Sequence, residues 1–180
     1  MQVPYDLLEK FNIKGAINSI APLDYGHIND SYSVQVGEEH FLLQRLNTEV
    51  FQTPEVVEQN LRNVLTHAPE LFAGHLCGEN GKIHQLKEAE YWRMQEFVQH
   101  SYSPEELSLN ELRQIAKGFG KFTLCMGLAK LSAYQEAIPD FHSLSFRLNQ
   151  FRSTLEKDSS GRAQSVKAEI EKVNSFQWIE

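Results

Sequence analysis

The stretch Ser31–Leu46, SYSVQVGEEHFLLQRL, contains two runs with the pattern of β-strands on either side of a turn. In the first run Tyr32, Val34 and Val36 alternate with polar residues, as in a strand that buries one face. Gly37 opens a short polar turn, and a second, more apolar run follows it. The stretch therefore predicts a β-hairpin, and the neighbouring segments extend it into a sheet.

The segments on both sides of this hairpin predict further strands and one well-marked helix. Thr53 suits the N-cap of that helix, Pro54 suits its first position, Glu55 complements its dipole, and Pro69 closes it. Together these patterns predict a sheet of about five antiparallel strands, with the helix inserted after the third. The remaining elements are a short helix at 3–11 and strands at 16–22, 71–77, 82–86 and 90–98.

The pattern changes near Pro104, after which only helical periodicity is found. The helices are predicted at about 110–131, 143–157 and 161–176. We therefore expect two domains in an α+β chain, a β-rich lobe over residues 1–100 and a helical region over residues 101–180.

The composition of the 180 residues excludes several classes of protein. Hydrophobic residues make up 41% of the chain, which argues against disorder, and the net charge of -7 disfavours a nucleic-acid binder. No run approaches the roughly 18 apolar residues of a membrane span. Cys77 and Cys125 form no CxxC pair and the histidines show no ligand spacing, so no disulfide framework and no metal site are predicted. A cytoplasmic location is expected.

Residues 25–33, YGHINDSYS, join two predicted strands and allow two interpretations. In the first, they form an ordinary hairpin loop with Gly26 and Asn29 at its special backbone positions, which the spacing alone favours. In the second, Gly26 lets main-chain N–H groups approach a phosphate closely.

Five segments together carry a resemblance to a known family: YGHINDSYSV (25–34), FLLQRLNTEVF (41–51), YWRMQEFVQH (91–100), FGKF (119–122) and PDFHSLSFR (139–147). In this combination and order the chain resembles the aminoglycoside phosphotransferase and choline kinase superfamily. Within it, the chain is most similar to N-acetylhexosamine 1-kinases, which use ATP to phosphorylate the anomeric hydroxyl of the sugar. The resemblance implies a protein-kinase-like N-terminal lobe followed by helices of an incomplete C-terminal lobe.

The resemblance also implies a nucleotide site in the β-rich lobe. The loop at Gly26 would fold over the ATP phosphates, with His27, Asn29 and Ser31 as polar contacts. Main-chain groups of Glu96 and Val98 would hydrogen-bond the adenine edge at the hinge between the lobes.

The third strand departs from the family pattern at the place of the usual lysine, which contacts the α- and β-phosphates and pairs with a helix glutamate. Gln44 or Arg45 stands there, and only one of them can face the nucleotide because successive strand residues face opposite sides. The apolar neighbours favour Gln44, whereas Arg45 would preserve the charge. Glu58 is the acid expected to pair, with Asn60 as a second candidate and a solvated Glu58–Arg62 pair as the alternative.

The segment around Asp140 would face the acceptor substrate. His142 and Arg147 could hydrogen-bond sugar hydroxyls and an N-acetyl carbonyl. Without the resemblance, a histidine ahead of a helix is more often a cap or a surface residue.

The catalytic part of the family pattern is absent from these residues. The superfamily places its base-like aspartate and an asparagine on an H-x-D-x-x-x-x-N loop, and that motif does not occur here. We therefore predict no catalytic residue in this chain and expect the Mg²⁺ ligands in a C-terminal half that lies outside it. The expectation is an N-terminal portion of a longer kinase, or a truncated product that binds ATP weakly at most.

Three functions remain open at this point. The first is a sugar 1-kinase whose partners are a nucleotide and a small sugar. The second is a phosphotransferase of the same superfamily that acts on homoserine, choline or an aminoglycoside. The third is a non-catalytic, kinase-like interaction module, and the oligomeric state is not predicted.

Overall fold

The computed structural model of the chain describes residues 3, 5–24, 26–99 and 107–176, and it contains two compact units, residues 1–137 and 138–180. The predicted domain boundary at residues 100 and 101 lies outside the described residues. Each unit is described by itself below.

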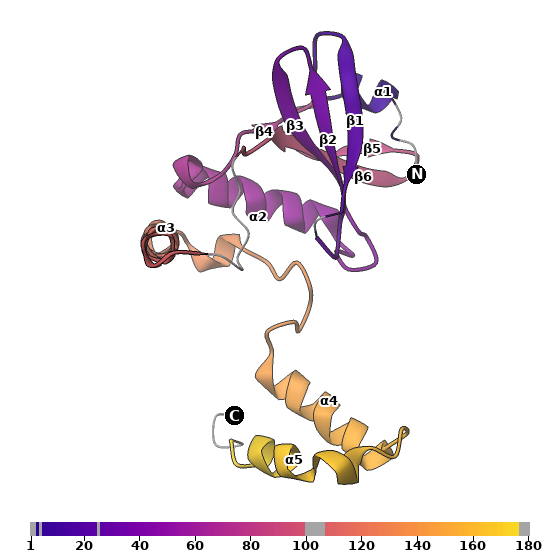
Figure 1. The fold of residues 1–180 in the computed structure, drawn as a ribbon, viewed down its shortest axis with the longest axis vertical. Helices are drawn as coiled ribbons and strands as arrows, with labels where there is room; N and C mark the ends of the chain where they lie inside the picture. Colours follow the sequence, from indigo (N-terminus) through magenta and orange to yellow (C-terminus); the bar gives the residue numbers. More distant parts are fainter. Residues whose placement is uncertain (1–2, 4, 25, 100–106, 177–180) are drawn as a thin grey trace. The chain divides into compact units, whose positions relative to one another are not determined.

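The first unit is built on an antiparallel sheet that has six strands within the described residues, where about five were predicted (Figure 1). The order is β1-β2-β3-β6-β4, and β5 pairs with β6 as the first strand of a β5–β6 hairpin. The strands are β1 (Ile17–Leu23), β2 (Asp30–Val36), β3 (Glu39–Arg45), β4 (His75–Leu76), β5 (Gln85–Lys87) and β6 (Glu90–Glu96).

The predicted hairpin is confirmed, with β2 and β3 paired from Asp30 and Arg45 to Val36 and Glu39. Gly37 begins its turn with φ +59°, a conformation that favours glycine, and the Gly37 N–H donates to Asn18 Oδ1 at 2.9 Å. The strand predicted over 71–77 is much shorter in the structure. Leu71 belongs to the 3-10 helix η1 (Pro69–Leu71), which Pro69 starts, and only His75 and Leu76 join the sheet.

The described part of the first unit contains three α-helices: α1 (Tyr5–Glu9), α2 (Pro54–His67) and α3 (Leu109–Met126). The helix predicted after the third strand is confirmed as α2, although Thr53 makes no side-chain capping hydrogen bond. Helix α3 begins with a capping box, in which Ser108 Oγ accepts from the Glu111 N–H and the Glu111 carboxylate accepts from the Ser108 N–H. The 3-10 helix η3 (Leu131–Ala133) follows it.

The second unit consists of α4 (Leu144–Lys157), the 3-10 helix η4 (Ala163–Val166) and α5 (Lys167–Asn174). Ser143 caps α4, because its Oγ accepts a hydrogen bond from the Phe146 N–H at 3.2 Å. At its C-terminal end Asp158 adopts φ +34° and its carboxylate accepts from the N–H of Arg162 and of Ala163. The helix predicted over 161–176 is therefore a 3-10 turn followed by a short α-helix.

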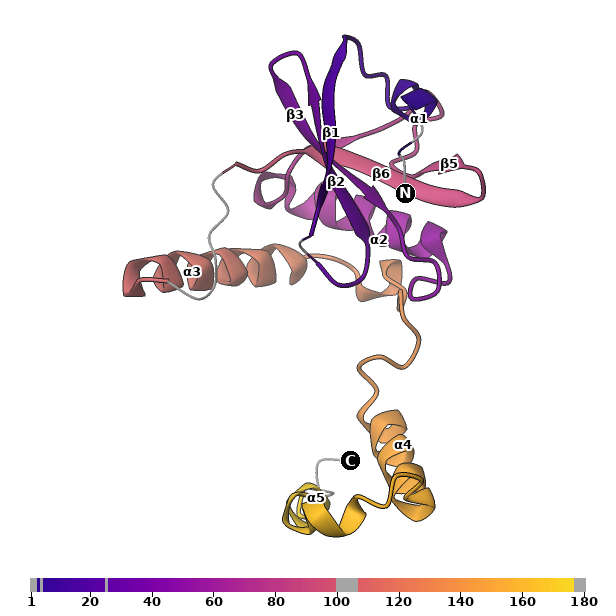
Figure 2. The same ribbon diagram turned by 45° about the vertical axis from the view of Figure 1, so that its right-hand side comes forward.

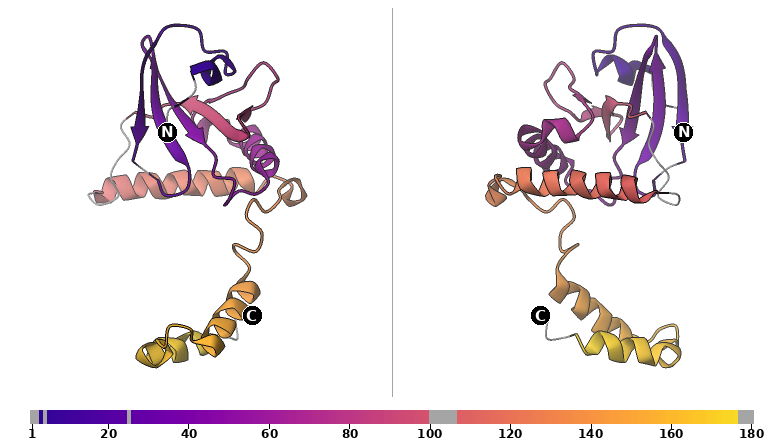
Figure 3. Two further views of the ribbon diagram at one scale, coloured as in Figure 1. Left: turned by 90° about the vertical axis from the view of Figure 1, so that its right-hand side faces the viewer. Right: turned by 60° about the vertical axis from the view of Figure 1, so that its left-hand side comes forward.

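The two faces of the sheet differ in polarity. One face carries the hydrophobic core, into which α1 packs. Figure 3 shows α1 and α2 on opposite sides of β6. Ser31, Gln44 and Arg93 lie on the other face, because they have the opposite parity along β2, β3 and β6. The core consists of Val3, Leu7, Leu8, Phe11, Tyr32, Val34, Val36, Phe41, Leu43, Trp92 and Met94.

Helix α2 lies on the polar face and holds the chain that follows α3 (Figure 2). The Tyr91 hydroxyl donates to Glu55 at 2.9 Å, which ties the first turn of α2 to β6. Asn60 exchanges two hydrogen bonds with the backbone of Gln135, and Asn63 Nδ2 donates to the Ala133 carbonyl. Asn60 is therefore occupied by the chain after η3, and none of these bonds joins it to strand three.

Helix α3 exposes much of its apolar surface within the first unit. Phe119 and Leu124 are 69% and 73% exposed, although Phe122 packs on Phe72 with ring centroids 6.1 Å apart. A Cβ on Gly118 or Gly120 would meet no atom within 4 Å, so no other described element packs closely on α3 at these two positions. None of the helices described here combines the length and the apolar character that crossing a bilayer requires.

We predict that the apolar face of β3 carries much of the stability of the first unit. Leu43 is fully buried in the core, so Leu43→Ala should lower the free energy of unfolding by about 2–5 kcal/mol. The matched change Leu86→Ala, at a side chain that is 51% exposed, should cost about 0.5 kcal/mol or less. Urea unfolding followed by circular dichroism measures both, and equal losses would contradict the assignment of the core.

Candidate functional site

A polar strip crosses the three central strands of the sheet, formed by Ser31 on β2, Gln44 on β3 and Arg93 on β6. Gln44 is the register partner of both other residues. Its Nε2 donates to Ser31 Oγ at 3.0 Å, while its Oε1 accepts from Arg93 Nε and Nη2 at 3.1 and 2.9 Å. Gln44 is thus held at both ends, and it fixes the direction of the Arg93 guanidinium.

Arg93 is half-buried, and its hydrogen bonds go to a neutral amide. Burial lowers the pKa of Arg93, although a guanidinium remains charged in proteins. Among the described residues no carboxylate forms an ion pair with it. The sequence analysis did not select Arg93. Its alternation with Trp92 and Met94 in YWRMQEF was the available signal, but only the register shows that it meets Gln44.

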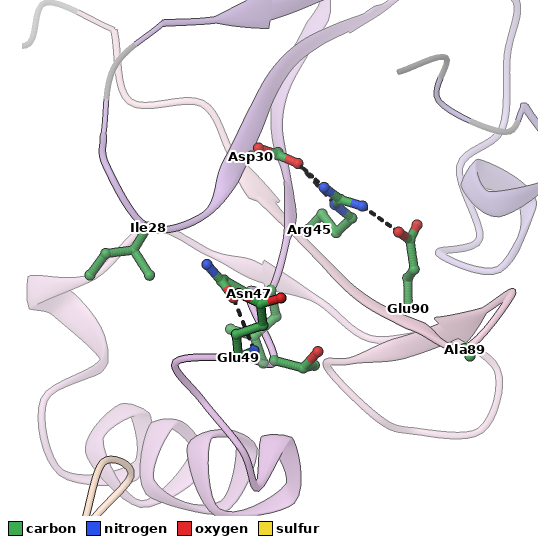
Figure 4. A pocket seen from close by; sticks show the side chains of 9 residues that line it. Ile28, Asp30, Arg45, Asn47, Glu49, Ala89 and Glu90 are labelled. Carbon is green, nitrogen blue, oxygen red and sulfur yellow. Dashed lines mark hydrogen bonds and ion pairs between the residues drawn. The ribbon is translucent and has the colours of Figure 1, made fainter.

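Arg45 lies on the opposite face of β3, at the end of the apolar core. Its guanidinium forms ion pairs with Asp30 and Glu90, as Figure 4 shows. Burial lowers the pKa of Arg45, but the hydrogen bonds to Glu90 and Asp30 raise it by more, so the net shift is upward. Two carboxylates therefore neutralise Arg45. The carboxylates of Asp30 and Glu90 border a pocket of about 310 Å³. The pocket is lined by Ile28, Asp30, Arg45, Leu46, Asn47, Thr48, Glu49, Ala89 and Glu90.

The loop between β1 and β2 combines an exposed start with an anchored end. Gly26 has φ +102°, where an L side chain would be strained, and Gly26 and His27 are exposed. Asn29 is half-buried, and its Oδ1 accepts the Asn47 N–H at 3.0 Å. Asn29 therefore ties the loop to the chain that leaves β3, and Ser31 is buried beneath it with its hydroxyl bonded to Gln44.

Glu58 holds the segment before β5. Its Oε1 accepts from Arg62 Nε and Nη2 at 3.0 and 2.8 Å and from the Ile83 N–H at 3.0 Å, and its Oε2 accepts from the His84 N–H. The expected Glu58–Arg62 pair is present, but it is not solvated, since the Glu58 side chain is only 13% exposed. None of these contacts joins Glu58 to Gln44 or Arg45.

Two histidines lie close to this face. His84 is buried, and its Nδ1 is 3.7 Å from Glu58 Oε2, beyond hydrogen-bond distance. Burial lowers the pKa of His84 and of His75, and the positive charge of Arg93 lowers both further. Both rings are therefore neutral at pH 7 and add no charge to the polar strip.

The predicted hinge residues stand at the end of β6. The Glu96 N–H donates to the Gly74 carbonyl at 2.8 Å, and the next N–H, of Phe97, donates to the His40 carbonyl at 3.0 Å. Val98 follows with its side chain 61% exposed. The chain thus leaves the sheet immediately before Val98.

His142 and Arg147 belong to the second unit, at the start of α4. The His142 ring contacts the Phe141 ring edge-on, with centroids 4.8 Å apart. The Arg147 guanidinium carbon lies 5.5 Å from the centroids of both Phe141 and Phe146, and its Nε donates to the Phe141 carbonyl. These contacts order a small aromatic cluster within the second unit.

No family model matches the sequence. Among solved structures, the chain is similar to spectinomycin phosphotransferase APH(9)-Ia, crystallised in complex with ADP and spectinomycin. The TM-score is 0.60 and the sequence identity is 11%, over 88% of this chain and 51% of that one. This chain therefore spans about half the length of the phosphotransferase. The likeness confirms the α+β, kinase-like fold predicted from the sequence.

The hydrogen bonds of Glu58 make a prediction about stability and pH. Burial raises the pKa of Glu58, but the bonds from Arg62 and from the Ile83 and His84 N–H groups lower it more, so the pKa falls below its ordinary 4.5. A carboxylate whose pKa is lower in the folded state than in the unfolded state stabilises the fold at pH values above its unfolded-state pKa. This stabilisation is lost as the pH falls through the folded-state pKa.

We therefore expect Glu58→Gln to destabilise the protein by about 1–3 kcal/mol at pH 7. The difference in the free energy of unfolding between this variant and the unsubstituted protein should become smaller as the pH drops below about 4.5. Urea unfolding at several pH values measures this difference, and Glu70→Gln, at an exposed carboxylate, should show almost none. A difference that stays constant down to pH 3 would contradict the assigned network.

Proposed function

We propose that this chain is the nucleotide-binding, N-terminal part of an ATP-dependent small-molecule phosphotransferase. The observation that carries the proposal is its kinase-like fold, shared with a phosphotransferase that was crystallised with ADP. In support, the β1–β2 loop has a glycine at φ +102° beside a polar sheet face, where main-chain N–H groups can approach phosphates.

Each predicted nucleotide residue takes a role that suits its position. Gly26 and His27 lie in the exposed part of the loop and would cover the phosphates. Asn29 and Ser31 would hold the loop through Asn47 and Gln44. At the hinge, main-chain groups of Glu96 and Val98 would meet the adenine edge.

The other three residues of the predicted nucleotide site, Gln44, Arg45 and Glu58, differ in their expected roles. Gln44 faces the polar side of the sheet and would be a neutral donor below the loop. Arg45 and Glu58 are committed to ion pairs and would stabilise the lobe without contacting the nucleotide.

Transfer of the phosphoryl group requires residues that we do not assign to this chain. No H-x-D-x-x-x-x-N motif occurs in the 180 residues. Within the described residues, no group of three or more His, Cys, Asp and Glu side chains is placed to hold a metal ion. We therefore assign this chain no step of the transfer itself.

The acceptor that we favour is an N-acetylhexosamine, phosphorylated at its anomeric hydroxyl in the cytoplasm. The favoured acceptor rests on the segments that resemble N-acetylhexosamine 1-kinases, with His142 and Arg147 as the residues that would contact the sugar. An aminoglycoside-like acceptor is the second candidate, because the similar structure holds spectinomycin. Homoserine or choline would need other contacts, and a module without catalysis would need no acceptor.

The nucleotide site predicts a specific binding pattern for this chain. ADP added to isotope-labelled protein should shift backbone amide resonances of Gly26, His27, Gln44 and Val98. The amide resonances of Leu7 and Leu8, buried on the opposite side of the sheet, should stay unshifted and serve as the control. Absence of any shift at millimolar ADP would overturn the nucleotide-binding proposal.

The acceptor is tested on the whole protein that contains these 180 residues. ATP, Mg²⁺ and a panel of N-acetylhexosamines, homoserine, choline and aminoglycosides are supplied, and phosphorus NMR identifies the product. A sugar 1-phosphate is the expected product. Phosphorylation of spectinomycin or another aminoglycoside alone would replace the sugar with the second candidate.

A further inference from the structure

The polar face of the sheet lacks a cation from strand three. Gln44, which occupies that face, is neutral. Arg45, the adjacent residue, faces the other side and is neutralised by Asp30 and Glu90. A phosphate placed under the β1–β2 loop would therefore meet no positive side chain of β3.

Arg93 provides a positive charge on that same face. Its strand, β6, neighbours β3, and the register places it directly beside Gln44. The guanidinium is half-buried, and its bonds to Gln44 Oε1 use only Nε and Nη2, which leaves the other N–H groups of the guanidinium available to a ligand. A partly buried cation whose hydrogen bonds go to a neutral amide keeps its net charge, which attracts an anion more strongly there than in water.

The groups around Arg93 do not supply a competing anion. Helix α2 carries two acids, and both have other partners. Glu58 is held by Arg62 and by two backbone N–H groups, and Glu55 accepts a hydrogen bond from the Tyr91 hydroxyl. His75 and His84 are neutral because burial and the Arg93 charge both lower their pKa values. Ser31 contributes only a hydroxyl. The charge of Arg93 is therefore available to an anionic ligand.

We propose that Arg93 binds the α- and β-phosphates of the nucleotide in place of the strand-three lysine, with Gln44 as the residue that orients it. This inference rests on the proposed function and names the residue that would carry its phosphate contact. A guanidinium suits the role, because its fork of N–H groups can bind two phosphate oxygens at once.

The position of Arg93 along β6 agrees with a nucleotide that reaches the hinge. Arg93 precedes Glu96 by three residues, which corresponds to roughly 10 Å along a strand. A base at the hinge and a diphosphate at Arg93 would thus lie along the same strand, with the ribose between them. Gln44 then replaces the helix glutamate of the usual pair, since it orients the cation through a hydrogen bond without neutralising it.

The test measures binding of ADP, adenosine and inorganic pyrophosphate to the 180-residue chain by calorimetry. Arg93→Met should weaken the binding of ADP and of pyrophosphate about 10- to 100-fold, because the phosphate contact is lost. The affinity for adenosine should change by about twofold or less. Arg93→Lys should restore part of the loss. Lys14→Met removes the same charge from an exposed position in the loop before β1 and should change nothing.

A second variant keeps the test valid if Arg93→Met fails to fold. Gln44→Glu preserves the shape of the side chain and its bond to Arg93, but adds a negative charge that neutralises the guanidinium. It should leave the free energy of unfolding the same or higher, as urea unfolding reports, while weakening ADP and pyrophosphate about tenfold or more.

The outcomes separate this inference from the proposed function. If ADP binds and neither Arg93→Met nor Gln44→Glu weakens it, the Arg93 assignment is wrong and nucleotide binding stands. If Arg45→Met weakens ADP binding and Arg93→Met does not, the cation that binds the phosphates is on β3. If adenosine and ADP both fail to bind but pyrophosphate binds in an Arg93-dependent way, the anion site stands and the nucleotide proposal falls. Failure of all three ligands overturns both.

Discussion

The pairing of β3 with β2 on one side and β6 on the other sets which side chains share a face, and the rest of the first unit depends on it. Tyr32, Leu43 and Met94 meet on the α1 side, whereas Ser31, Gln44 and Arg93 meet on the other. Because side chains alternate along a strand, a slip of one residue in β3 would bury Gln44 and expose Leu43. The apolar core therefore holds the polar strip in register.

Local patterns were sufficient for most of the elements, whereas the kinase-like fold was predicted from the resemblance to a family. Alternation along 31–46 predicted the hairpin, and Pro54 and Pro69 marked the helix between the third strand and the rest of the sheet, as the structure has it. The short strands β4 and β5 were less well predicted. They make few backbone pairs, so their limits depend on turns such as η1 more than on any periodic pattern.

The predicted site residues were harder to interpret, because their roles depend on partners far away in the sequence. Arg45 pairs with Glu90, which is 45 residues away, and Gln44 meets Arg93 at a separation of 49 residues. A single sequence shows neither pairing. Its resemblance to a family directed attention to the position of the missing lysine on β3 and gave no reason to consider β6. Of the two partners considered for Glu58, the structure has Arg62, and the backbone partners at Ile83 and His84 required the structure.

The energetics of Arg93 favour a functional reason for its position. Removing a guanidinium from water is costly, and a neutral amide compensates for this less than a carboxylate would. A leucine or methionine at position 93 could pack on Gln44 without that cost, and a glutamate at position 44 would neutralise the charge. The chain has neither, whereas on the opposite face it pairs Arg45 with two acids. The same strands thus neutralise one arginine and leave the other charged, which is the arrangement expected where an anionic ligand completes the pair.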